Sequence, residues 1–566
     1  MSFTIVETMT SEPPSQHARE HMVAMRDGVE LATDVYLPDE VSTHSAVLVR
    51  TCYDKSSRYT ALTFEAEYYR SRGYVFVAQD VRGKFRSGGE TLPYAYDVAD
   101  GYDTAEWITR QPWSNGRIGV TGQSYYGFTT WAAVASGHPA IRAAVPMVTG
   151  IDMGAGHVGA QWSQQVPYIA GLNDLLQIWT DRNGYLAEID WSADSVENIV
   201  AAARTRIGEC RAATDMLGRS ADQGWYNPYG DRHPYHTTSI PVLHWQNWYD
   251  PGLAPLGLRD WRHFRSLAGQ RDLHFLRAGS ADHSGYLLQD VGAGDERNPY
   301  LSESTLAEKI ETECGEVADF FDEHLDGLRP TAPRPRARWH VGHVGWQSSQ
   351  EYPPPSRPLT FHLSAHRSRT YTLNPEPDEN ATSLTWTHDP EHPVPSSTDI
   401  EAIWYLLADC PDERDLADRR DVLTFRTEPL TEHVDFAGQP VLTGRVTFSA
   451  PSTHVFAKLQ DVHPDGTTRP ISWGRAVLSE RAGGSLALAL DDNAYRLRRG
   501  HCLQLQIQSS DFPHSAVHPG TDGNPWLTTK RIPSTQSLGV GGLTGARLVL
   551  PAITVAEAPE TPAQVG

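Results

Sequence analysis

A chain of 566 residues is too long for one hydrophobic core, because single cores stop growing at roughly 250–300 residues, so we expect two or three domains. With 39% hydrophobic and 21% charged residues, the composition is that of a globular protein and argues against a disordered chain. The formal net charge of −22 argues against nucleic acid and membranes as partners, since a polyanion or an anionic lipid surface would repel this protein.

The first half of the chain alternates between strand and helix patterns. His21–Pro38 alternates apolar and polar residues around Asp27-Gly28, which predicts a β-hairpin at the edge of a sheet. Helical patterns cover Thr60–Arg70 and Tyr102–Thr109. Short apolar runs predict strands at Ala46–Val49, Tyr74–Ala78, Ile118–Thr121, Ala143–Val148, Val242–Trp245 and His274–Leu276. Strands that are apolar on both faces and alternate with helices are typical of a mostly parallel sheet covered by helices.

This alternation is interrupted once and then ends. Between 151 and 239, aromatic and leucine residues recur at helical spacing, which predicts an inserted helical cap. After the proline-rich stretch Arg329–Arg338, short alternating runs predict a separate jelly-roll β-sandwich over 330–566. An α/β catalytic domain would then comprise 1–150 and 240–329.

Ser124 is the candidate nucleophile. It lies in Gly122-Gln-Ser-Tyr-Tyr-Gly127, between a β-branched strand and a segment, Tyr125–Ala135, that can be helical. A serine on such a sharp turn is exposed above an α/β-hydrolase sheet, and the helix N-terminus supplies amide donors where negative charge develops. The usual pattern has glycine at position 126, where this chain has Tyr126. The alternative is that Ser124 only caps the helix.

A serine hydroxyl needs a histidine base, and that histidine needs an acid to orient it. In α/β-hydrolases the order along the chain is Ser, then Asp or Glu, then His. Asp250 follows the predicted strand at 242–245, and His283 follows the strand at 274–276. Asp282 is a rival acid, and each of these residues could instead belong to a turn or to the surface. His244 and His274 lie within strands and are expected to be structural.

The ordered set of motifs resembles the family of α/β-hydrolases that contains cocaine esterase, X-Pro dipeptidyl-peptidases, α-amino acid ester hydrolases and glutaryl acylases. The resemblance spans nearly the whole chain. It rests on Met25-Arg-Asp-Gly28, Arg50-Thr-Cys-Tyr53-Asp-Lys55, Asp80-Val-Arg-Gly83, Gln111-Pro-Trp-Ser-Asn-Gly116, Gly122-Gln-Ser-Tyr-Tyr-Gly127 and Trp248-Tyr-Asp250.

This resemblance implies roles for individual residues. The family's nucleophile motif, Gly-x-Ser-Tyr-x-Gly, makes the late Gly127 the expected form, and its Trp-Tyr-Asp acid corresponds to Asp250. The family's catalytic base is the last residue of a Gly-Pro-Trp-x-His stretch. This residue corresponds to His283, although Ser280-Ala281 replaces Pro-Trp here. The family's oxyanion hole implies the Tyr53 hydroxyl and the backbone amide of Tyr125. We expect Asp80, Arg82, Gly83 and Trp113 to have structural roles and to take no part in catalysis.

Together these features predict a serine hydrolase that cleaves a small ester or amide through an acyl-enzyme. Aromatic residues of the cap, Trp162, Trp179 and Trp225, are candidates for an apolar substrate pocket, although each could equally be core. An aminopeptidase, an acyltransferase and a non-catalytic carbohydrate- or partner-binding protein remain alternatives.

No cofactor or metal is predicted, because the histidines show no spacing such as HExxH. The five cysteines are scattered and form no CxxC pair, and no run of about 18 apolar residues occurs, which favours a cytoplasmic protein. The oligomeric state stays open, a homo-oligomer included.

Overall fold

A computed structural model provides the structure of the protein. It describes residues 15–153, 166, 179, 198, 201, 204–205, 228–250, 252–285, 302–365, 371–396, 411–479, 484–525 and 528–555. Most of the predicted cap, with Trp162 and Trp225, lies outside the described residues. The end of that segment contains the short helices η1 (Gly230–Arg232) and α9 (Pro234–Thr237).

A mostly parallel sheet forms the first body of the molecule. In the described part of the chain it contains ten strands, in the order β1-β2-β4-β3-β5-β6-β7-β8-β9-β10. These are β1 (Ala18–Ala24), β2 (Glu30–Tyr36), β3 (His44–Thr51), β4 (Val75–Asp80), β5 (Ser114–Gln123), β6 (Ile141–Met147), β7 (Val242–Tyr249), β8 (His274–Asp282), β9 (Ala337–Val341) and β10 (Gly345–Ser349). From β4 to β9 neighbouring strands are parallel. The antiparallel pair β1 and β2 confirms the predicted edge hairpin.

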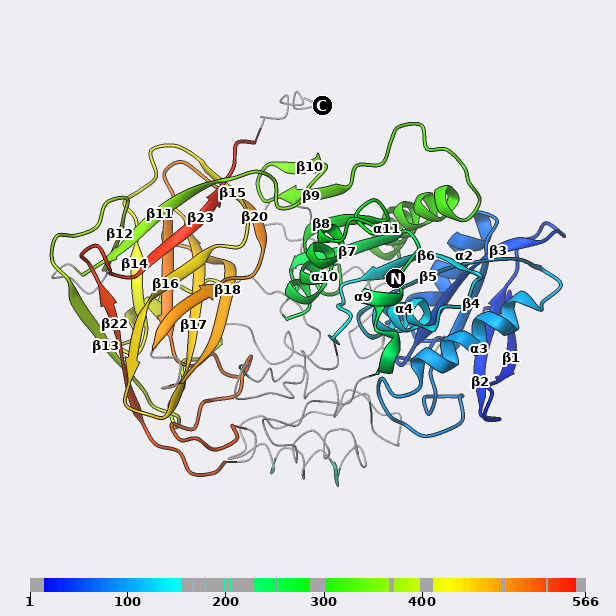
Figure 1. Cartoon of the computed structure of the whole chain (residues 1–566), viewed down its shortest axis with the longest axis horizontal. Coiled ribbons are helices and arrows are strands. Elements are labelled where there is room, and N and C mark those ends of the chain that lie inside the picture. The colour runs from blue at the N-terminus through cyan, green and yellow to red at the C-terminus, as the bar shows by residue number, and fades with distance from the viewer. Residues whose placement is uncertain are drawn as a thin grey trace.

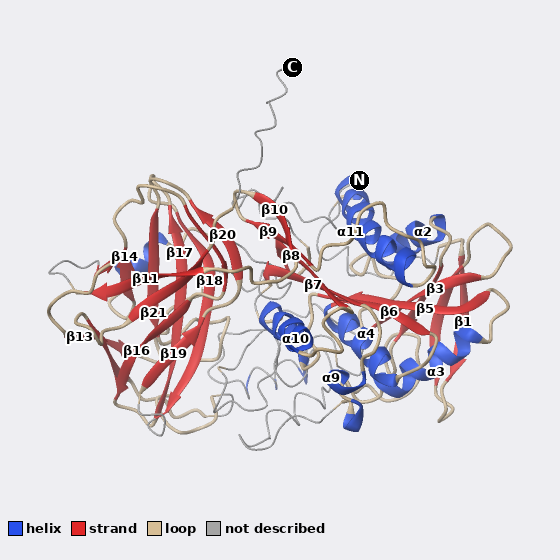
Figure 2. Ribbon diagram, turned by 45° about the horizontal axis from the view of Figure 1, so that its top comes forward, coloured by secondary structure: helices blue, strands red, loops and turns tan. Residues whose placement is uncertain are grey.

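Helices cover both faces of this sheet (Figure 2). One face carries α2 (Leu62–Ser71) and α11 (Glu303–His324), and the other carries α3 (Asp97–Thr109), α4 (Ser124–Ser136) and α10 (Ala254–Ser266). Every residue of β4 and of α4 is buried, which explains why neither has a polar face. In α10 the buried Leu258, Trp261 and Phe264 recur at helical spacing and face the sheet.

The sheet continues past residue 329, where the sequence predicts that the second domain begins. Strand β9 pairs with β8 in parallel, and β10 returns antiparallel to β9. Residues 337–349 therefore belong to the first sheet by their hydrogen bonds. The proline-rich stretch at the expected boundary lies between α11 and β9.

The second body, which we call the β domain, is largely antiparallel. Thirteen strands of the described chain form its sheet, with β12 and β14 the parallel pair. They are β11 (Arg357–Ser364), β12 (Tyr371–Asn374), β13 (Thr382–His388), β14 (Leu423–Arg426), β15 (Val434–Gly438), β16 (Val441–Phe448), β17 (Ser452–Val462), β18 (Thr468–Ser479), β19 (Ser485–Ala489), β20 (Asn493–Leu497), β21 (Cys502–Gln508), β22 (Ser534–Val540) and β23 (Arg547–Ala552). The predicted fold class, an α/β domain followed by a β domain, is confirmed.

The two bodies share a core. Figure 1 shows them side by side, with β7 to β10 and α10 nearest the β domain. Trp248 and Tyr249, at the end of β7, are buried in one cluster with side chains of the β domain. The Trp248 indole donates to the His340 carbonyl at 2.8 Å, and the Trp261 indole donates to the Tyr352 carbonyl at 3.1 Å. The end of β7 is therefore fixed by both bodies.

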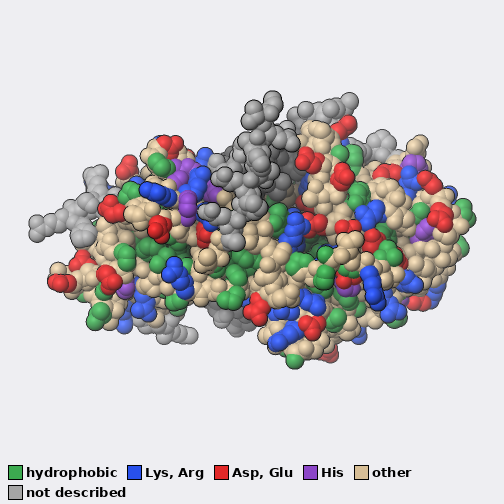
Figure 3. Space-filling view, turned by 90° about the horizontal axis from the view of Figure 1, so that it is seen from above, with side chains coloured by type: hydrophobic (Ala, Val, Ile, Leu, Met, Phe, Trp, Pro, Cys, Tyr) green, Lys and Arg blue, Asp and Glu red, His purple; other side chains and the backbone are tan. Residues whose placement is uncertain are grey.

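The surface carries both signs of charge. Figure 3 shows basic and acidic side chains interspersed over one face of the molecule. Among the described helices, none is both long enough and apolar enough to cross a membrane.

Several histidines are buried in both bodies. His244 on β7 and His274 on β8 are joined by a 2.8 Å hydrogen bond between their rings, which confirms their predicted structural role. Burial lowers the pKa of His244 to about 3. In the β domain, burial lowers the pKa of His518 to about 3 and that of His454 well below its usual value. Within the described residues neither ring nitrogen of His454 has a hydrogen-bond partner.

These histidines predict that acid destabilises the fold. Between its lowered pKa in the folded state and about pH 6.5, a buried neutral histidine binds fewer protons in the folded than in the unfolded state. The free energy of unfolding is therefore highest above about pH 6.5 and falls as the pH decreases toward the pKa of the folded state. Each histidine should cost about 2 kcal/mol between pH 6.5 and pH 5. Urea unfolding at the two pH values measures this difference. The variant His454→Phe should show a smaller difference than the wild type, whereas His392→Phe, at an exposed position, should match the wild type.

Candidate active site

Ser124 occupies the sharp turn between β5 and α4. Strand β5 ends at Gln123 with extended backbone, and α4 begins at Ser124 with a φ of 55°. A positive φ is strained for a residue with a side chain and is retained where the surrounding structure enforces it, often at functional sites. The predicted strand–turn–helix context of this serine is therefore present.

Two glycines make this turn sterically accessible. A Cβ on Gly122 would lie 2.6 Å from the Tyr126 carbonyl oxygen, and a Cβ on Gly127 would lie 2.9 Å from the carbonyl oxygens of Gly122 and Met147. Both approaches involve backbone atoms, which cannot move aside cheaply. Position 127, one turn into α4, therefore requires glycine, which is the physical reason for the late glycine of the motif.

Tyr53 lies beside the serine. Its hydroxyl is 3.3 Å from the Ser124 Oγ, and the tyrosine is buried. The loop that carries it is anchored two residues later, where the Lys55 amide donates to the Asp80 carboxylate at 2.9 Å and the Lys55 ammonium lies 2.8 Å from Asp34. Asp80 has the scaffold role that was predicted for it, and it holds the Tyr53 loop in place.

Tyr125 is the second residue of α4, where the backbone N–H groups point out of the helix N-terminus. Its hydroxyl donates to Asp97 at 2.7 Å and accepts from the Tyr94 amide at 2.8 Å. Trp179, from the predicted cap, is buried with its ring centroid 4.8 Å from that of Tyr125. The sequence analysis missed Asp97, because only the tertiary structure brings it to the tyrosine.

Asp250 and His283 form a pair at the ends of β7 and β8. The Asp250 Oδ1 lies 3.0 Å from the His283 Nδ1. Strands β5, β7 and β8 are parallel in one sheet, so Ser124, Asp250 and His283 all follow the same carboxyl edge. The rival acid Asp282 instead accepts the Ser284 amide at 3.0 Å and closes the turn after β8. This contrast favours Asp250 as the partner of His283.

Asp250 is shielded from solvent, and residues of the β domain lie close to it. Burial raises the pKa of Asp250, while the adjacent His283 acts to lower it. Trp473 of β18 packs edge-on against Tyr249 at a centroid distance of 6.1 Å. Burial raises the pKa of Asp491, on the loop before β20, to about 6, and the negative charge of Asp250 adds to that rise. Neither Trp473 nor Asp491 was predicted, since their proximity depends on how the two bodies pack.

The other predicted scaffold residues contact neighbouring loops and strands. Arg82 pairs with Asp100 and with Asp27. A Cβ on Gly83, which has a φ of 72°, would lie 2.5 Å from the Glu90 carbonyl carbon. Trp113 packs against Trp107 with their ring centroids 6.3 Å apart. These contacts confirm that the residues hold loops and strands together.

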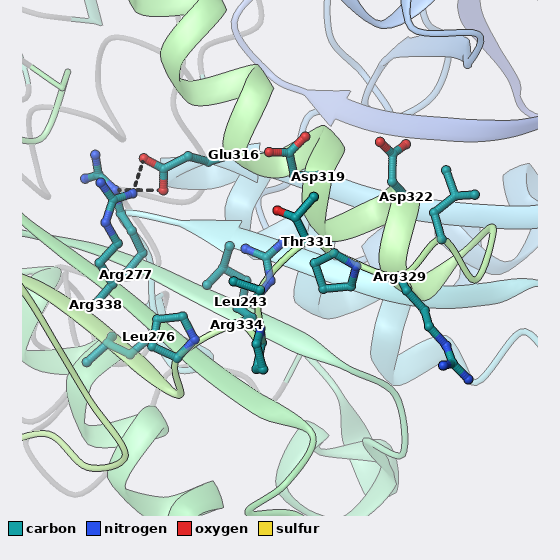
Figure 4. A pocket seen from close by; sticks show the side chains of 15 residues that line it. Leu243, Leu276, Arg277, Glu316, Asp319, Asp322, Arg329, Thr331, Arg334 and Arg338 are labelled. Atoms are coloured by element: carbon teal, nitrogen blue, oxygen red, sulfur yellow. Dashed lines mark ion pairs between the residues drawn. The ribbon is translucent and has the colours of Figure 1, made fainter.

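A pocket of about 530 Å³ lies beside α11, away from this edge (Figure 4). Its wall includes Leu243 and Leu276, near the starting ends of β7 and β8, whereas Asp250 and His283 follow the other ends. Glu316 of α11 pairs in it with Arg338 at 2.9 Å and with Arg277 at 3.6 Å. These ion pairs tie α11 to β8 and β9.

The helix-covered, mostly parallel sheet with its serine turn between β5 and α4 defines an α/β-hydrolase of the serine type. Comparison with known proteins identifies the family within this class. The profile of X-Pro dipeptidyl-peptidase (S15 family) matches residues 27–284, and that of the X-Pro dipeptidyl-peptidase C-terminal non-catalytic domain matches residues 331–542. Cocaine esterase from Rhodococcus sp. (strain MB1 Bresler) is 30% identical over 544 residues, which cover 89% of this chain and 92% of that protein.

Solved structures agree in fold. An α-amino acid ester hydrolase superposes with a TM-score of 0.79 at 24% identity and covers 98% of both chains. An aminopeptidase from the marine sediment archaeon Thaumarchaeota archaeon gives a TM-score of 0.77 at 21% identity, covering 96% of this chain and 98% of that one.

The chain belongs to the cocaine esterase and X-Pro dipeptidyl-peptidase (S15) family of α/β-hydrolases, and it is a serine hydrolase. The predicted family resemblance and enzyme class are confirmed.

Proposed function

We propose that this serine hydrolase is an esterase that cleaves a small carboxylic ester through an acyl-enzyme on Ser124. His283 is the base that takes the serine proton, and Asp250 orients it. The Tyr53 hydroxyl and the Tyr125 backbone amide form the oxyanion hole. The observation that carries the proposal is the 3.3 Å approach of the Tyr53 hydroxyl to Ser124 on its strained turn.

The mechanism follows from these positions. The Ser124 Oγ attacks the ester carbonyl carbon while its proton passes to the Nε2 of His283. Asp250, which faces the Nδ1 of the same ring, stabilises the imidazolium. The oxygen of the tetrahedral intermediate accepts hydrogen bonds from Tyr53 and from the Tyr125 amide, donors that are in place before charge develops. His283 then protonates the leaving alcohol, and a water molecule releases the acid by the reverse sequence.

The oxyanion donors are held by buried contacts, which supports this assignment. The Tyr125 side chain is fixed by Asp97 and by the Tyr94 amide, so its backbone cannot easily rotate away from Ser124. The Lys55 and Asp80 contact limits the Tyr53 loop in the same way. A pre-aimed donor pair needs little reorganisation during the reaction, which is the main source of its catalytic effect.

The substrate is an ester with an apolar or aromatic acyl group in this proposal. Trp179 packs beside Tyr125, so an acyl group on Ser124 would lie near aromatic surface. Cocaine esterase, an esterase by its name, is the relative at 30% identity. The predicted pocket residues Trp162 and Trp225 remain proposals, as do the cap at 151–239 and a cytoplasmic location.

Loss of the nucleophile provides the first prediction. Ser124→Ala should fold like the wild type but lose about 10⁴-fold or more of kcat on an activated aryl ester. It should also lose covalent labelling by a fluorophosphonate, because labelling requires an activated serine. Mass spectrometry of the labelled peptide is the readout. Wild-type turnover by this variant would disprove the assignment, and failure of the wild type to label would favour a non-catalytic binding protein.

The oxyanion role of Tyr53 provides a second prediction. Tyr53→Phe keeps the ring but removes the donor, so kcat should fall about 10²- to 10³-fold with little change in KM. Tyr59→Phe is the matched control, since that ring packs edge-on against Tyr53 at 5.8 Å but has no role in the proposed mechanism. Equal losses in the two variants would mean that Tyr53 acts only through packing.

Substrate class can be tested with two compounds. The proposal expects faster turnover of an aryl ester of an apolar acid than of an aminoacyl-proline amide, because no anchor for a free amino terminus is assigned among the described residues. The reverse order of kcat/KM would favour an aminopeptidase on the same catalytic groups. Product that appears only when a second alcohol or amine is added would favour an acyltransferase.

A further inference from the structure

A group of titratable side chains in the β domain has no part in the proposed catalysis. Asp461 lies near the end of β17, His463 follows the strand, and His501 precedes β21. Because β17 and β21 are antiparallel, with Val462 opposite Cys502, the three residues come together. One potential ligand atom from each lies within 4.8 Å of the other two.

The hydrogen bonds of this group leave one nitrogen unsatisfied. Asp461 is fully buried, its Oδ1 lies 2.7 Å from the His501 Nδ1, and its Oδ2 accepts from the Tyr495 hydroxyl at 2.9 Å. The His463 Nε2 lies 3.8 Å from the same Oδ2, which is too far for a hydrogen bond. It is shielded from solvent and has no hydrogen-bond partner among the described residues. A buried polar atom left in this way is costly unless something binds to it.

Two imidazoles and one carboxylate are a ligand set typical of zinc and of other divalent transition metals. We propose that Asp461, His463 and His501 bind one such ion, with Zn²⁺ as the probe. His463 would bind through Nε2, Asp461 through a carboxylate oxygen and His501 through Nδ1. Water would complete a four-coordinate site, because the described residues supply three ligands.

Binding requires a small local rearrangement. The His501 Nδ1 proton, which faces Asp461 in the metal-free state, must leave so that this nitrogen can coordinate, and solvent can supply the Nε2 proton of the other tautomer. The bond from Tyr495 to Asp461 can remain and orient the carboxylate from outside the ligand set. The positive charge of Arg498 near His463 opposes a cation, whereas the negative charge of Asp465 favours one.

The site also touches the junction of the two bodies. Tyr495 accepts a 3.0 Å hydrogen bond from the Nε2 of His343, which lies on the turn between β9 and β10. The adjacent Gly342 forms a β-bridge to Tyr495. Metal binding would therefore stabilise the contact between the last hairpin of the first sheet and the β domain. The sequence analysis predicted no metal because the histidines show no local ligand spacing. Asp461 and His501 are 40 residues apart, and only strand pairing brings them together.

The test uses tag-free, full-length protein treated with EDTA and dialysed. Titration with Zn²⁺ in a calorimeter, repeated against a chromophoric chelator, should show one site that is lost in both His463→Ala and His501→Ala. The melting temperature of the wild type should rise by about 2 °C or more with excess Zn²⁺, and that of His463→Ala should not. His392→Ala, at an exposed position beside Asp389, is the matched control and should retain the site.

Two further measurements separate the possible outcomes. Ser124→Ala should bind Zn²⁺ like the wild type, so the metal site can be judged independently of the proposed esterase mechanism. His463→Gln serves as a second variant if His463→Ala does not fold, since glutamine retains a polar group at this position. Absence of binding in the wild type, or binding that persists unchanged in the His463 and His501 variants, would show that the three residues form a hydrogen-bonded cluster only.

Discussion

The position of Asp250 depends on burial of the end of β7 between the two bodies. Trp248 and Tyr249 insert into the shared core, and the Trp248 indole is fixed to the His340 carbonyl. The carboxylate that follows is thereby brought to His283 and removed from water, which raises its pKa. The β domain thus helps to bury the end of β7 that carries Asp250, since Tyr249 packs against Trp473 of β18.

Buried ionic contacts hold the other half of the site. Lys55 lies between Asp34 and Asp80 behind the Tyr53 loop, and Arg50 lies 3.4 Å from Asp97, which accepts from Tyr125. Removing charges from water is expensive and adds little net stability even when they are paired. Such contacts do restrict geometry, and here they restrict the loop and the helix start that carry Tyr53 and Tyr125, the proposed oxyanion donors. This arrangement is consistent with a site in which rigidity matters more than stability.

The proposed catalytic residues and the Asp461 cluster depend on the same kind of constraint. In each, hydrogen bonds between neighbouring strands bring together residues that are far apart in the chain. Ser124, Asp250 and His283 follow parallel strands at one edge, whereas the Asp461 cluster lies at the paired ends of two antiparallel strands. Both carboxylates are buried and each lies beside a histidine, Asp250 beside His283 and Asp461 beside His501, and Asp461 also accepts a hydrogen bond from Tyr495.

The sequence by itself determined the local elements: the edge hairpin, the strand–helix alternation and the serine turn follow from periodicity and from Gly122 and Gly127, which act over a few residues. It also indicated that Asp250 and His283 each follow a strand, which are β7 and β8 in the structure. Only the tertiary structure decided that Asp250 rather than Asp282 faces His283, that β9 and β10 extend the first sheet, and that Asp97 and Asp491 lie near the site. These features depend on strand order and on packing between distant segments, and local periodicity carries no information about either.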